Sequence, residues 1–492
     1  MNIYMLIDAL LEYGKEKGLL EEIDYYYTLN ALLAIFKLDE YVKPTTKANL
    51  TLDEILNFML DYAINNNLIE SSNENKDLFD TKIMGVFAKK PSVFKEKMDE
   101  LINVCPSTAT TYFYNYCKNI NYIRASRIAK DIHFDYLSKY GTIKISINMS
   151  KPEKDPNDIK KLLTLKKSSY PKCMLCLENI NYAGHVGFPA RQTLMVYPLT
   201  LANEHYYMQY SPYSYFNEHI ICFHEDHFNM RMTNQSFKEL VSFINIFPHY
   251  FIGSNTNLPI VGGSILNHQH FQGGKAILPM ENAKEVFMYE TNGVNVYKLI
   301  WPMNAIRLKC KDDNKLLDFA FKILAKWLDY ENKDLMIINS KEEIHNTITP
   351  ITRKKNEVYE FDLVLRNNIT TSGRPLGLFH PQEKYWHIKK ENIGLIEVMG
   401  LAILPSRLNN EMKLVKKYLL NESLSEDELN NIENHIEWAN EIKHNNNISK
   451  ENVDAIVNDA IGEVFVNVLK DCAVFKDENI DEFDKFINSI KE

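Results

Sequence analysis

The sequence predicts an α+β fold, with a mainly antiparallel sheet in the middle of the chain and helical segments at both ends. Residues 1–120 and 411–492 repeat apolar side chains at near-helical spacing. Residues 171–375 differ, because prolines, glycines and aromatic residues become frequent and short β-rich runs appear. At 492 residues the chain is too long for one ordinary core, so we expect two to four domain-sized units.

The N-terminal region illustrates the helical pattern. Leu6, Leu10 and Leu11 share one helical face, and Asp53 stands before an apolar-periodic run as a helix start would. We find no chemical constellation in this region and interpret it as a helical scaffold. Residues 141–149 then alternate apolar and polar side chains, which predicts a half-buried strand, and residues 151–167 are expected to form a loop leading into a helix.

The central region is expected to supply the sheet. A helix is predicted over Ser236–Phe247 and a further strand over Val358–Arg366. The other short β-rich runs are predicted at Thr193–Tyr197, His219–Phe223, Pro259–Leu266 and Val286–Tyr289. After residue 411 the pattern returns to helix, with Asn-rich breaks near 444–448.

Composition excludes several classes of protein. A formal net charge of −9 argues against a general nucleic-acid binder, which needs clustered Lys and Arg. No uncharged apolar run approaches the ~18 residues of a membrane span, so no membrane partner is expected. Seven cysteines scattered along the chain argue against a disulfide framework, and the absence of a secretory pattern at the first residues makes a reducing cytoplasm the expected location.

The most informative stretch is His268-Gln-His270-Phe-Gln272, an H-x-H-x-Q string with a glycine pair on each side. In an extended backbone, residues i, i+2 and i+4 project from one face, so two imidazoles and one carboxamide would converge. A neutral imidazole is a competent nucleophile toward phosphorus. We therefore expect His270, Gln272 and His268 to be catalytic; the alternative is a strand with two inert, hydrogen-bonded histidines.

A second constellation begins with Cys173-Met-Leu-Cys176 and continues at Cys222-Phe-His224-Glu-Asp-His227. An isolated C-x-x-C pair is redox-active, metal-binding or incidental. Two cysteines and two histidines from separate loops can make a tetrahedral zinc site. Cys173, Cys176, His227 and His268 are the predicted metal ligands, with His224 as the alternative to His227.

Other residues are candidates for substrate binding. Arg191 follows a Gly/Pro turn and can present a guanidinium to a diphosphate, and Arg366 ends a predicted strand; either can also be a surface residue. Glycines allow close approach of backbone and ligand, so we also include the segments flanking the H-x-H-x-Q string: Gly262, Gly263, Ser264, Gly273, Gly274 and Lys275. The stretch 380–394 mixes aromatic residues, histidines and lysines, and is either a sugar-binding or a structural loop.

Together these motifs resemble the galactose-1-phosphate uridylyltransferase family, in its second (bacterial) class. The resemblance spans essentially the whole chain. Its most specific part is 258–274, from Leu-Pro-Ile-Val-Gly-Gly to His-Gln-His-Phe-Gln-Gly-Gly. Supporting segments are 187–193, Trp301-Pro, 345–350 and 392–402. Asn257 and Asn267 depart from the family pattern without touching the expected nucleophile.

The resemblance implies two halves related to the histidine-triad superfamily. We therefore expect a helical region 1–140, a catalytic half 141–300, a second half 301–410 and a helical region 411–492. It implies a ping-pong exchange of UMP between UDP-glucose and galactose 1-phosphate through uridylyl-His270. In the first class, zinc is held by C-x-x-C, a later His and the first His of the triad, an order that Cys173, Cys176, His227 and His268 match. The family also implies a homodimer.

Two other functions stay open at this point. One keeps the histidine nucleophile but changes the substrate, as in a dinucleoside polyphosphate phosphorylase or another nucleotidyl transferase. The other is a non-enzymatic, zinc-stabilised UDP-sugar sensor, which would bind the sugar nucleotide without forming a phosphoramidate.

Overall fold

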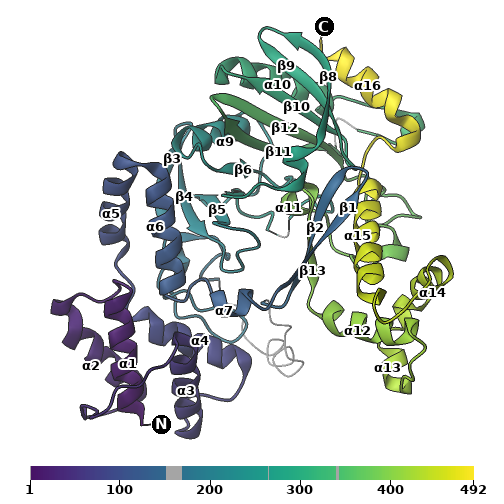
Figure 1. Cartoon of the computed structure of the whole chain (residues 1–492). Helices are drawn as coiled ribbons and strands as arrows, with labels where there is room; N and C mark the ends of the chain where they lie inside the picture. The colour runs from purple at the N-terminus through teal and green to yellow at the C-terminus, as the bar shows by residue number, and fades with distance from the viewer. Residues whose placement is uncertain (1, 151–168, 264, 340–342, 492) are drawn as a thin grey trace.

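The computed structural model in Figure 1 describes residues 2–150, 169–263, 265–339 and 343–491. It confirms an α+β fold in which a large sheet lies between a helical N-terminal unit and a C-terminal group of helices. Ser264 and the loop and helix predicted over 151–167 lie outside the described residues.

The N-terminal unit is helical, as predicted. Its helices pack together through their apolar faces, which include the buried residues Leu6, Leu10 and Leu11. The cap of the third helix is Thr51, in a reciprocal capping box with Glu54, rather than Asp53 as the sequence pattern suggested. The helices are α1 Ile3–Glu16, α2 Tyr25–Phe36, α3 Leu52–Asn65, α4 Asn73–Gly85, α5 Pro91–Val104, α6 Pro106–Asn119 and α7 Ala125–Ile128.

The ten-stranded sheet consists of two halves with the same order of elements. The first half is β3 Tyr197–Leu201, β4 Glu204–Tyr210, β5 Ile220–His224, α9 Asn234–Ile246, β6 Phe251–Gly253 and β7 His270–Gly274. The second is β8 Lys284–Thr291, β9 Val294–Ile300, β10 Ala305–Cys310, α10 Asp313–Leu328, β11 Asn346–Lys355 and β12 Val358–Asn367. The order across the sheet is β3-β4-β5-β7-β6-β11-β12-β10-β9-β8, with every pair antiparallel. The halves therefore meet at β6 and β11, and β12 takes in the second half the place of β7 in the first.

The two faces of this sheet have different covers. On one face α9 and α10 pack over residues such as Ile252, Phe271 and Leu363. On the other face, Phe251 and Ile351 belong to a second core. A three-stranded sheet contributes to that second core: β1 Ile132–Ser138, β2 Gly141–Asn148 and β13 Leu401–Pro405, of which β13 runs parallel to β2.

Helices complete the C-terminal part of the chain, as the sequence predicted. They are α11 Leu395–Val398, α12 Arg407–Leu419, α13 Glu426–Asn430, α14 Ile436–Asn445, α15 Val453–Asp471 and α16 Ile480–Ser489. The Asn-rich stretch after α14 is the predicted break. α15 packs on β1 and β2, while Phe483 and Phe486 of α16 join the core beneath α10.

Several predicted strands are confirmed and two differ. Val358–Arg366, His219–Phe223 and Val286–Tyr289 fall on β12, β5 and β8, within a residue or two at their ends. The strand expected at 193–197 begins only at Tyr197. The strand expected over 259–266 is wrong: its described residues form an irregular loop, in which Thr256 Oγ1 lies 3.2 Å from the Leu258 carbonyl oxygen and 3.1 Å from that of Val261, so the chain folds back on itself.

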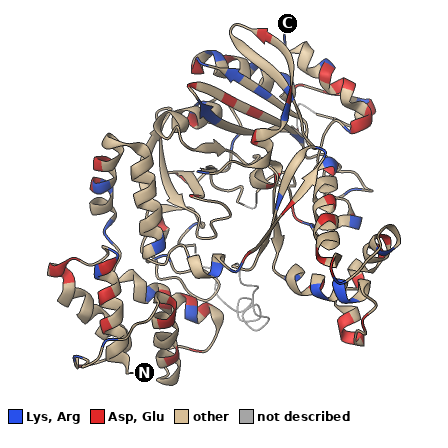
Figure 2. Ribbon diagram, viewed as in Figure 1, with Lys and Arg blue, Asp and Glu red and all other residues tan. Residues whose placement is uncertain are grey.

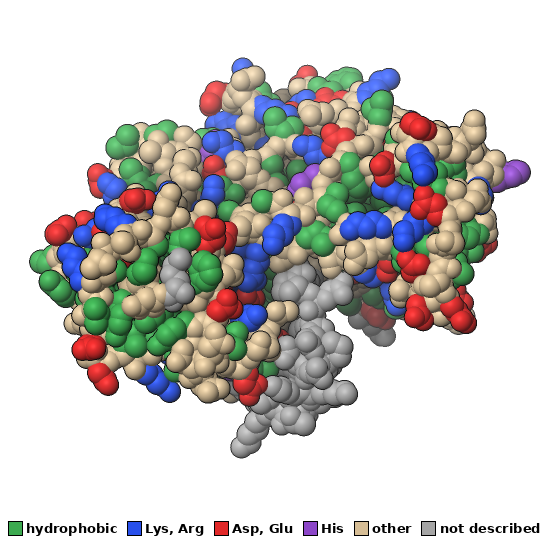
Figure 3. Space-filling view, turned by 60° about the horizontal axis from the view of Figure 1, so that its bottom comes forward, with side chains coloured by type: hydrophobic (Ala, Val, Ile, Leu, Met, Phe, Trp, Pro, Cys, Tyr) green, Lys and Arg blue, Asp and Glu red, His purple; other side chains and the backbone are tan. Residues whose placement is uncertain are grey.

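Charged side chains of both signs lie on the surface, although the formal net charge is −9. On the face drawn in Figure 3, basic and acidic side chains are interspersed. Among the described residues, none of the helices combines the length and apolar character that crossing a bilayer requires. All seven cysteines are free thiols.

Candidate active site and metal cluster

A cavity of about 660 Å³ lies beside strand β7. His270 and Gln272 line it from the first half of the sheet, with Ile221 from the neighbouring β5. The loop after β6 adds Gly262 and Gly263. The remaining wall comes from distant parts of the chain: Asn148 at the end of β2, Leu175 of the C-x-x-C segment, and several residues of 389–406. The cavity is thus assembled from at least five segments.

His270 is held in one tautomer by the backbone. Its Nδ1 lies 2.8 Å from the carbonyl oxygen of His268 and must donate to it, because a carbonyl only accepts. Burial lowers the pKa of His270 to about 4, although this hydrogen bond opposes the shift. The ring is therefore neutral at cellular pH, and Nε2 is its unprotonated nitrogen. A buried, neutral imidazole on the wall of a cavity is suited to nucleophilic attack.

Gln272 lies two residues further along β7, on the same face as His270. Its Oε1 is 3.2 Å from Nε2 of His219, a buried residue directly before β5. The predicted convergence of side chains i+2 and i+4 of the motif therefore holds.

His268 departs from that prediction. It precedes β7 and lies in a bend, so the strand alternation does not reach it. It is not among the residues that line the cavity. Its Nε2 lies 2.8 Å from the carbonyl oxygen of His224 and donates to it, which leaves Nδ1 unprotonated, with its lone pair facing the two cysteines. The motif thus supplies His270 and Gln272 to the cavity and His268 to a separate cluster.

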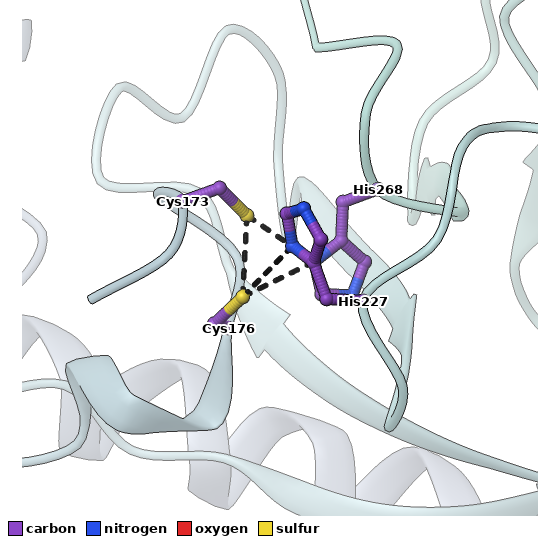
Figure 4. A group of neighbouring side chains, drawn as sticks. All are labelled: Cys173, Cys176, His227 and His268. Atoms are coloured by element: carbon purple, nitrogen blue, oxygen red, sulfur yellow. Dashed lines mark hydrogen bonds between the residues drawn. The ribbon is translucent and has the colours of Figure 1, made fainter. Parts of the chain in front are cut away.

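That cluster contains Cys173, Cys176, His227 and His268, whose ligand atoms all lie within 4.8 Å of one another (Figure 4). The sulfur atoms are 3.5 Å apart. Nδ1 of His268 is 3.2 Å from Cys173 Sγ, and Nδ1 of His227 is 3.1 Å from Cys176 Sγ. His224, the alternative to His227, instead accepts the Asp226 amide on Nδ1 and lies against Glu204 through Nε2.

The donor atoms of this cluster fit a metal ion. A tetrahedral ion with bonds of ~2.3 Å to sulfur and ~2.0 Å to nitrogen separates its ligand atoms by roughly 3.3–3.8 Å, close to the sulfur–sulfur and sulfur–nitrogen distances given above. Burial, followed by the neighbouring Cys173, raises the pKa of Cys176 to about 12. Two thiols held together in this way are poorly stabilised as thiolates by the protein alone, so the set suits a cation.

The glycines that flank the motif serve different purposes. A Cβ on Gly273 would lie 2.1 Å from the Phe251 carbonyl oxygen, and one on Gly274 would lie 2.3 Å from that of Glu218. These two glycines allow neighbouring backbone to approach β7 closely. Gly262 and Gly263, in contrast, line the cavity, where backbone can approach a ligand.

The three predicted cationic binding residues lie outside the cavity lining. Arg191 stacks near the ring of Tyr122 at 6.0 Å. Arg366 is buried and donates to the Ile393 carbonyl, directly behind the wall formed by Asn392 and Gly394. Lys275 lies 3.8 Å from Glu218.

The wall of the cavity opposite β7 includes residues of the stretch 380–394, for which the sequence left both a sugar-binding and a structural loop open. Lys389 is buried there, with Nζ 3.1 Å from Glu397 Oε1 and 3.6 Å from Glu391 Oε2. Asn392 and Tyr215 also line the cavity. The mixed aromatic, His and Lys composition of 380–394 was the available signal, but long-range contacts bring this segment to the site: β13, which follows it, pairs with β2, and Arg366 donates to the Ile393 carbonyl.

Comparisons with known proteins agree on one family. Residues 21–229 match the family described as galactose-1-phosphate uridyl transferase, N-terminal domain, and residues 242–440 match its C-terminal domain. The galactose-1-phosphate uridylyltransferase of Clostridium acetobutylicum is 46% identical over 490 residues, covering 98% of this chain and 99% of its own. Those of Clostridium perfringens and Fusobacterium nucleatum are 44% and 43% identical, each over 99% or more of both chains.

Among solved structures, yeast Ap4A phosphorylase matches 60% of this chain and 88% of its own, at 13% identity and a TM-score of 0.32. A superposition this poor supports no conclusion about the present chain.

Proposed function

Because the chain belongs to the galactose-1-phosphate uridylyltransferase family, we propose that it exchanges UMP between UDP-glucose and galactose 1-phosphate, a reaction of galactose metabolism. Nε2 of His270 attacks the α-phosphorus of UDP-glucose. The bond from that phosphorus to the bridging oxygen breaks, and glucose 1-phosphate leaves with the electron pair. A phosphate oxygen of galactose 1-phosphate then attacks uridylyl-His270, which releases the imidazole and gives UDP-galactose.

The observation that carries this proposal is the setting of His270. Its Nδ1–H is committed to the His268 carbonyl, so the neutral ring offers only Nε2 as a nucleophile beside the cavity. Glucose 1-phosphate is a weakly basic leaving group, so the first step requires no strong general acid. Covalent catalysis of this kind divides one displacement into two, and the same cavity serves both sugar phosphates in turn.

Gln272 is proposed to hold the phosphoryl oxygens through its amide N–H, because charge develops on those oxygens in the transition state. Gly262 and Gly263 are proposed to approach the diphosphate through their backbone. Asn392 and the group formed by Lys389, Glu391 and Glu397 offer polar atoms for sugar hydroxyls and the second phosphate.

We propose zinc as the ion for Cys173, Cys176, His227 and His268, since two sulfur and two imidazole ligands in a closed tetrahedral set are typical of structural zinc. A bound ion would fix the position of His268. Because the His268 carbonyl accepts the Nδ1–H of His270, a fixed His268 keeps the nucleophile in its orientation.

Isotope exchange tests the proposal. Incubating the protein with UDP-glucose and labelled glucose 1-phosphate, without galactose 1-phosphate, should move label into UDP-glucose, because the first half-reaction is reversible. A parallel incubation with diadenosine tetraphosphate should give no cleavage. Exchange absent from the wild-type protein, with cleavage of the dinucleotide, would replace the proposed substrate; binding of UDP-glucose without exchange would favour a sensor.

A further inference from the structure

His219 is a buried imidazole to which the reaction above assigns no role. It lies directly before β5, and the next two residues of the chain pair with Gly273 and Gln272 of β7. Only 2% of its surface is exposed. Its ring lies between aromatic neighbours, 5.6 Å from Tyr215 and 4.5 Å from Phe216 between ring centres. Its polar contact is with Gln272, whose Oε1 is 3.2 Å from Nε2 of the imidazole.

The surroundings of His219 decide which of its nitrogens carries the proton. Nδ1 is buried and has no hydrogen-bond partner among the described residues. A buried N–H without an acceptor is costlier and rarer than an unpaired acceptor. Burial also lowers the pKa of His219 to about 4, so the ring carries one proton. That proton therefore belongs on Nε2, where it is donated to Oε1 of Gln272.

This assignment has a consequence for Gln272. A carboxamide has an oxygen on one side and an NH₂ group on the other, and its terminal torsion is broad with a roughly two-fold preference. When His219 donates to the oxygen, the NH₂ group is turned away from His219. Since Gln272 lines the cavity beside His270, the NH₂ group is then the part available to a ligand there. The reversed amide would present an oxygen to phosphoryl oxygens and repel them.

We propose that His219 is a positioning residue for uridylyl transfer: it orients the Gln272 carboxamide so that its NH₂ group, and not its oxygen, meets the phosphoryl group. The inference rests on the proposed function for the identity of the reaction. It does not require His219 to contact substrate, and it gives a reason for placing an imidazole in an otherwise aromatic environment.

The test compares two variants of His219 in the exchange assay. His219→Phe keeps a flat ring between the aromatic neighbours but removes the donor, and we expect kcat for exchange to fall about 10-fold with little change in KM, as for loss of one orienting hydrogen bond. His219→Gln places an amide N–H near the position of Nε2 and should stay within about 3-fold of wild type. Thermal unfolding of both variants reports any loss of packing.

A double-mutant comparison separates orientation from packing. In a Gln272→Leu background there is no carboxamide to orient, so His219→Phe should have no further effect on exchange. If His219→Phe slows the Gln272→Leu protein as much as it slows the wild type, His219 acts independently of Gln272 and the inference is overturned. Equal loss in His219→Phe and His219→Gln would overturn it as well.

The tautomer provides a measurement independent of activity. Two-bond ¹⁵N–¹H correlation spectra of the wild-type protein should show His219 as a neutral ring protonated on Nε2. A proton on Nδ1 would contradict the inference even if exchange is observed. Conversely, a protein that lacks exchange but shows the Nε2–H tautomer would overturn the proposed reaction while leaving the orientation of Gln272 supported.

Discussion

Strand β7 in the first half of the sheet and strand β12 in the second hold the same place in the repeated strand order, but their polar residues have different surroundings. One row of paired residues crosses the sheet from Gln272 through Gly253 and Ile351 to Asp362. Gln272 and Asp362 therefore face the same side. Gln272 lines the cavity together with His270, whereas Asp362 is enclosed by cations.

The enclosure of Asp362 is an ion network across β10, β11 and β12, visible as blue and red bands on these strands in Figure 2. Arg307 Nε lies 2.5 Å from Asp362 Oδ1, and Arg353 Nη1 lies 3.0 Å from Oδ2. Although burial raises it, the charges of Arg353 and Arg307 hold the pKa of Asp362 below its usual value. The network continues through Glu281, Glu285, Lys309, Lys355 and Glu360.

The difference shows that a repeated fold does not repeat a function. In the second half, opposite charges saturate one another, so the face is closed and its polar groups contribute to structure. In the first half, the imidazole and carboxamide have single anchoring partners and keep one polar edge for a ligand. The availability of an unsatisfied polar edge beside a cavity, more than residue polarity, distinguishes the candidate site.

The largest expected effect is on the first half. His270→Ala should reduce label exchange by ~10⁴-fold or more, because it removes the atom that forms the covalent intermediate. Glu360→Gln, a same-face change on β12, is the matched control and should retain exchange at a temperature where the protein is folded. Comparable losses in the two variants would mean that the halves are not functionally distinct.

The second half should respond in stability. Asp362→Asn removes the buried carboxylate that Arg307 and Arg353 share, and breaking a buried pair costs about 3–5 kcal/mol in the free energy of unfolding. Denaturant unfolding measures this change. Glu290→Gln, at an exposed carboxylate on β8, should change stability by no more than about 0.5 kcal/mol. A neutral result for Asp362→Asn would remove the structural role that we assign to the network.

Changes in the cluster of Cys173, Cys176, His227 and His268 should affect the activity of the first half and leave the ion network of the second half intact. Cys176→Ser should abolish binding of the proposed zinc ion, one per chain. It should also slow exchange by about 10- to 100-fold, because His268 is then no longer held by the ion and its carbonyl accepts the Nδ1–H that orients His270. Metal content by mass spectrometry and the exchange rate report the two effects. Cys105→Ser, outside the cluster, should alter neither; exchange at the wild-type rate in metal-free Cys176→Ser protein would separate the cluster from catalysis.

Lowering the pH should also distinguish the two halves, by a smaller change in the free energy of unfolding than the substitutions above. Burial lowers the pKa of His249, near the start of β6, to about 4, below the ordinary ~6.5. Its contribution to stability is therefore complete above pH 6.5 and is lost as the pH falls toward 4, by roughly 1 kcal/mol once partial exposure is allowed for. His249→Asn should flatten this part of the stability–pH curve.

The carboxylates of the network also lose their contribution to stability on acidification, but at lower pH than His249. The pKa of Asp362 and that of Glu360 are lowered in the folded protein, so their contribution is present above about pH 4 and is lost below it. His249 lies near the start of β6, and its Nε2 is 2.9 Å from Oγ1 of Thr110 in α6. Hydrogen exchange followed segment by segment should therefore show β6 and α6 loosening before β12 as the pH falls. Simultaneous loosening, or β12 loosening first, would contradict this order.

Local patterns carried much of the prediction. The H-x-H-x-Q string and the C-x-x-C pair identified residues that the fold brings together, and alternation located β2. What sequence reasoning missed depends on long-range pairing. The segment around Lys389 reaches the cavity through contacts between residues far apart in the sequence, such as the pairing of β13 with β2. The role proposed for His219 follows from its contact with Gln272 on β7. Neither contact produces a periodic pattern in the local sequence. Pro259–Leu266 reads as a strand by composition, but the hydroxyl of Thr256 folds it into a loop.

The most direct test of the account is to expose the intact protein to UDP-glucose without an acceptor, quench it under alkaline conditions and measure its mass. We predict a mass increase of one uridylyl group per chain, located on His270 by peptide mapping and removed by adding galactose 1-phosphate. A chain that exchanges label without acquiring the group, or that carries it on another residue, would contradict the assignment of His270 as the nucleophile.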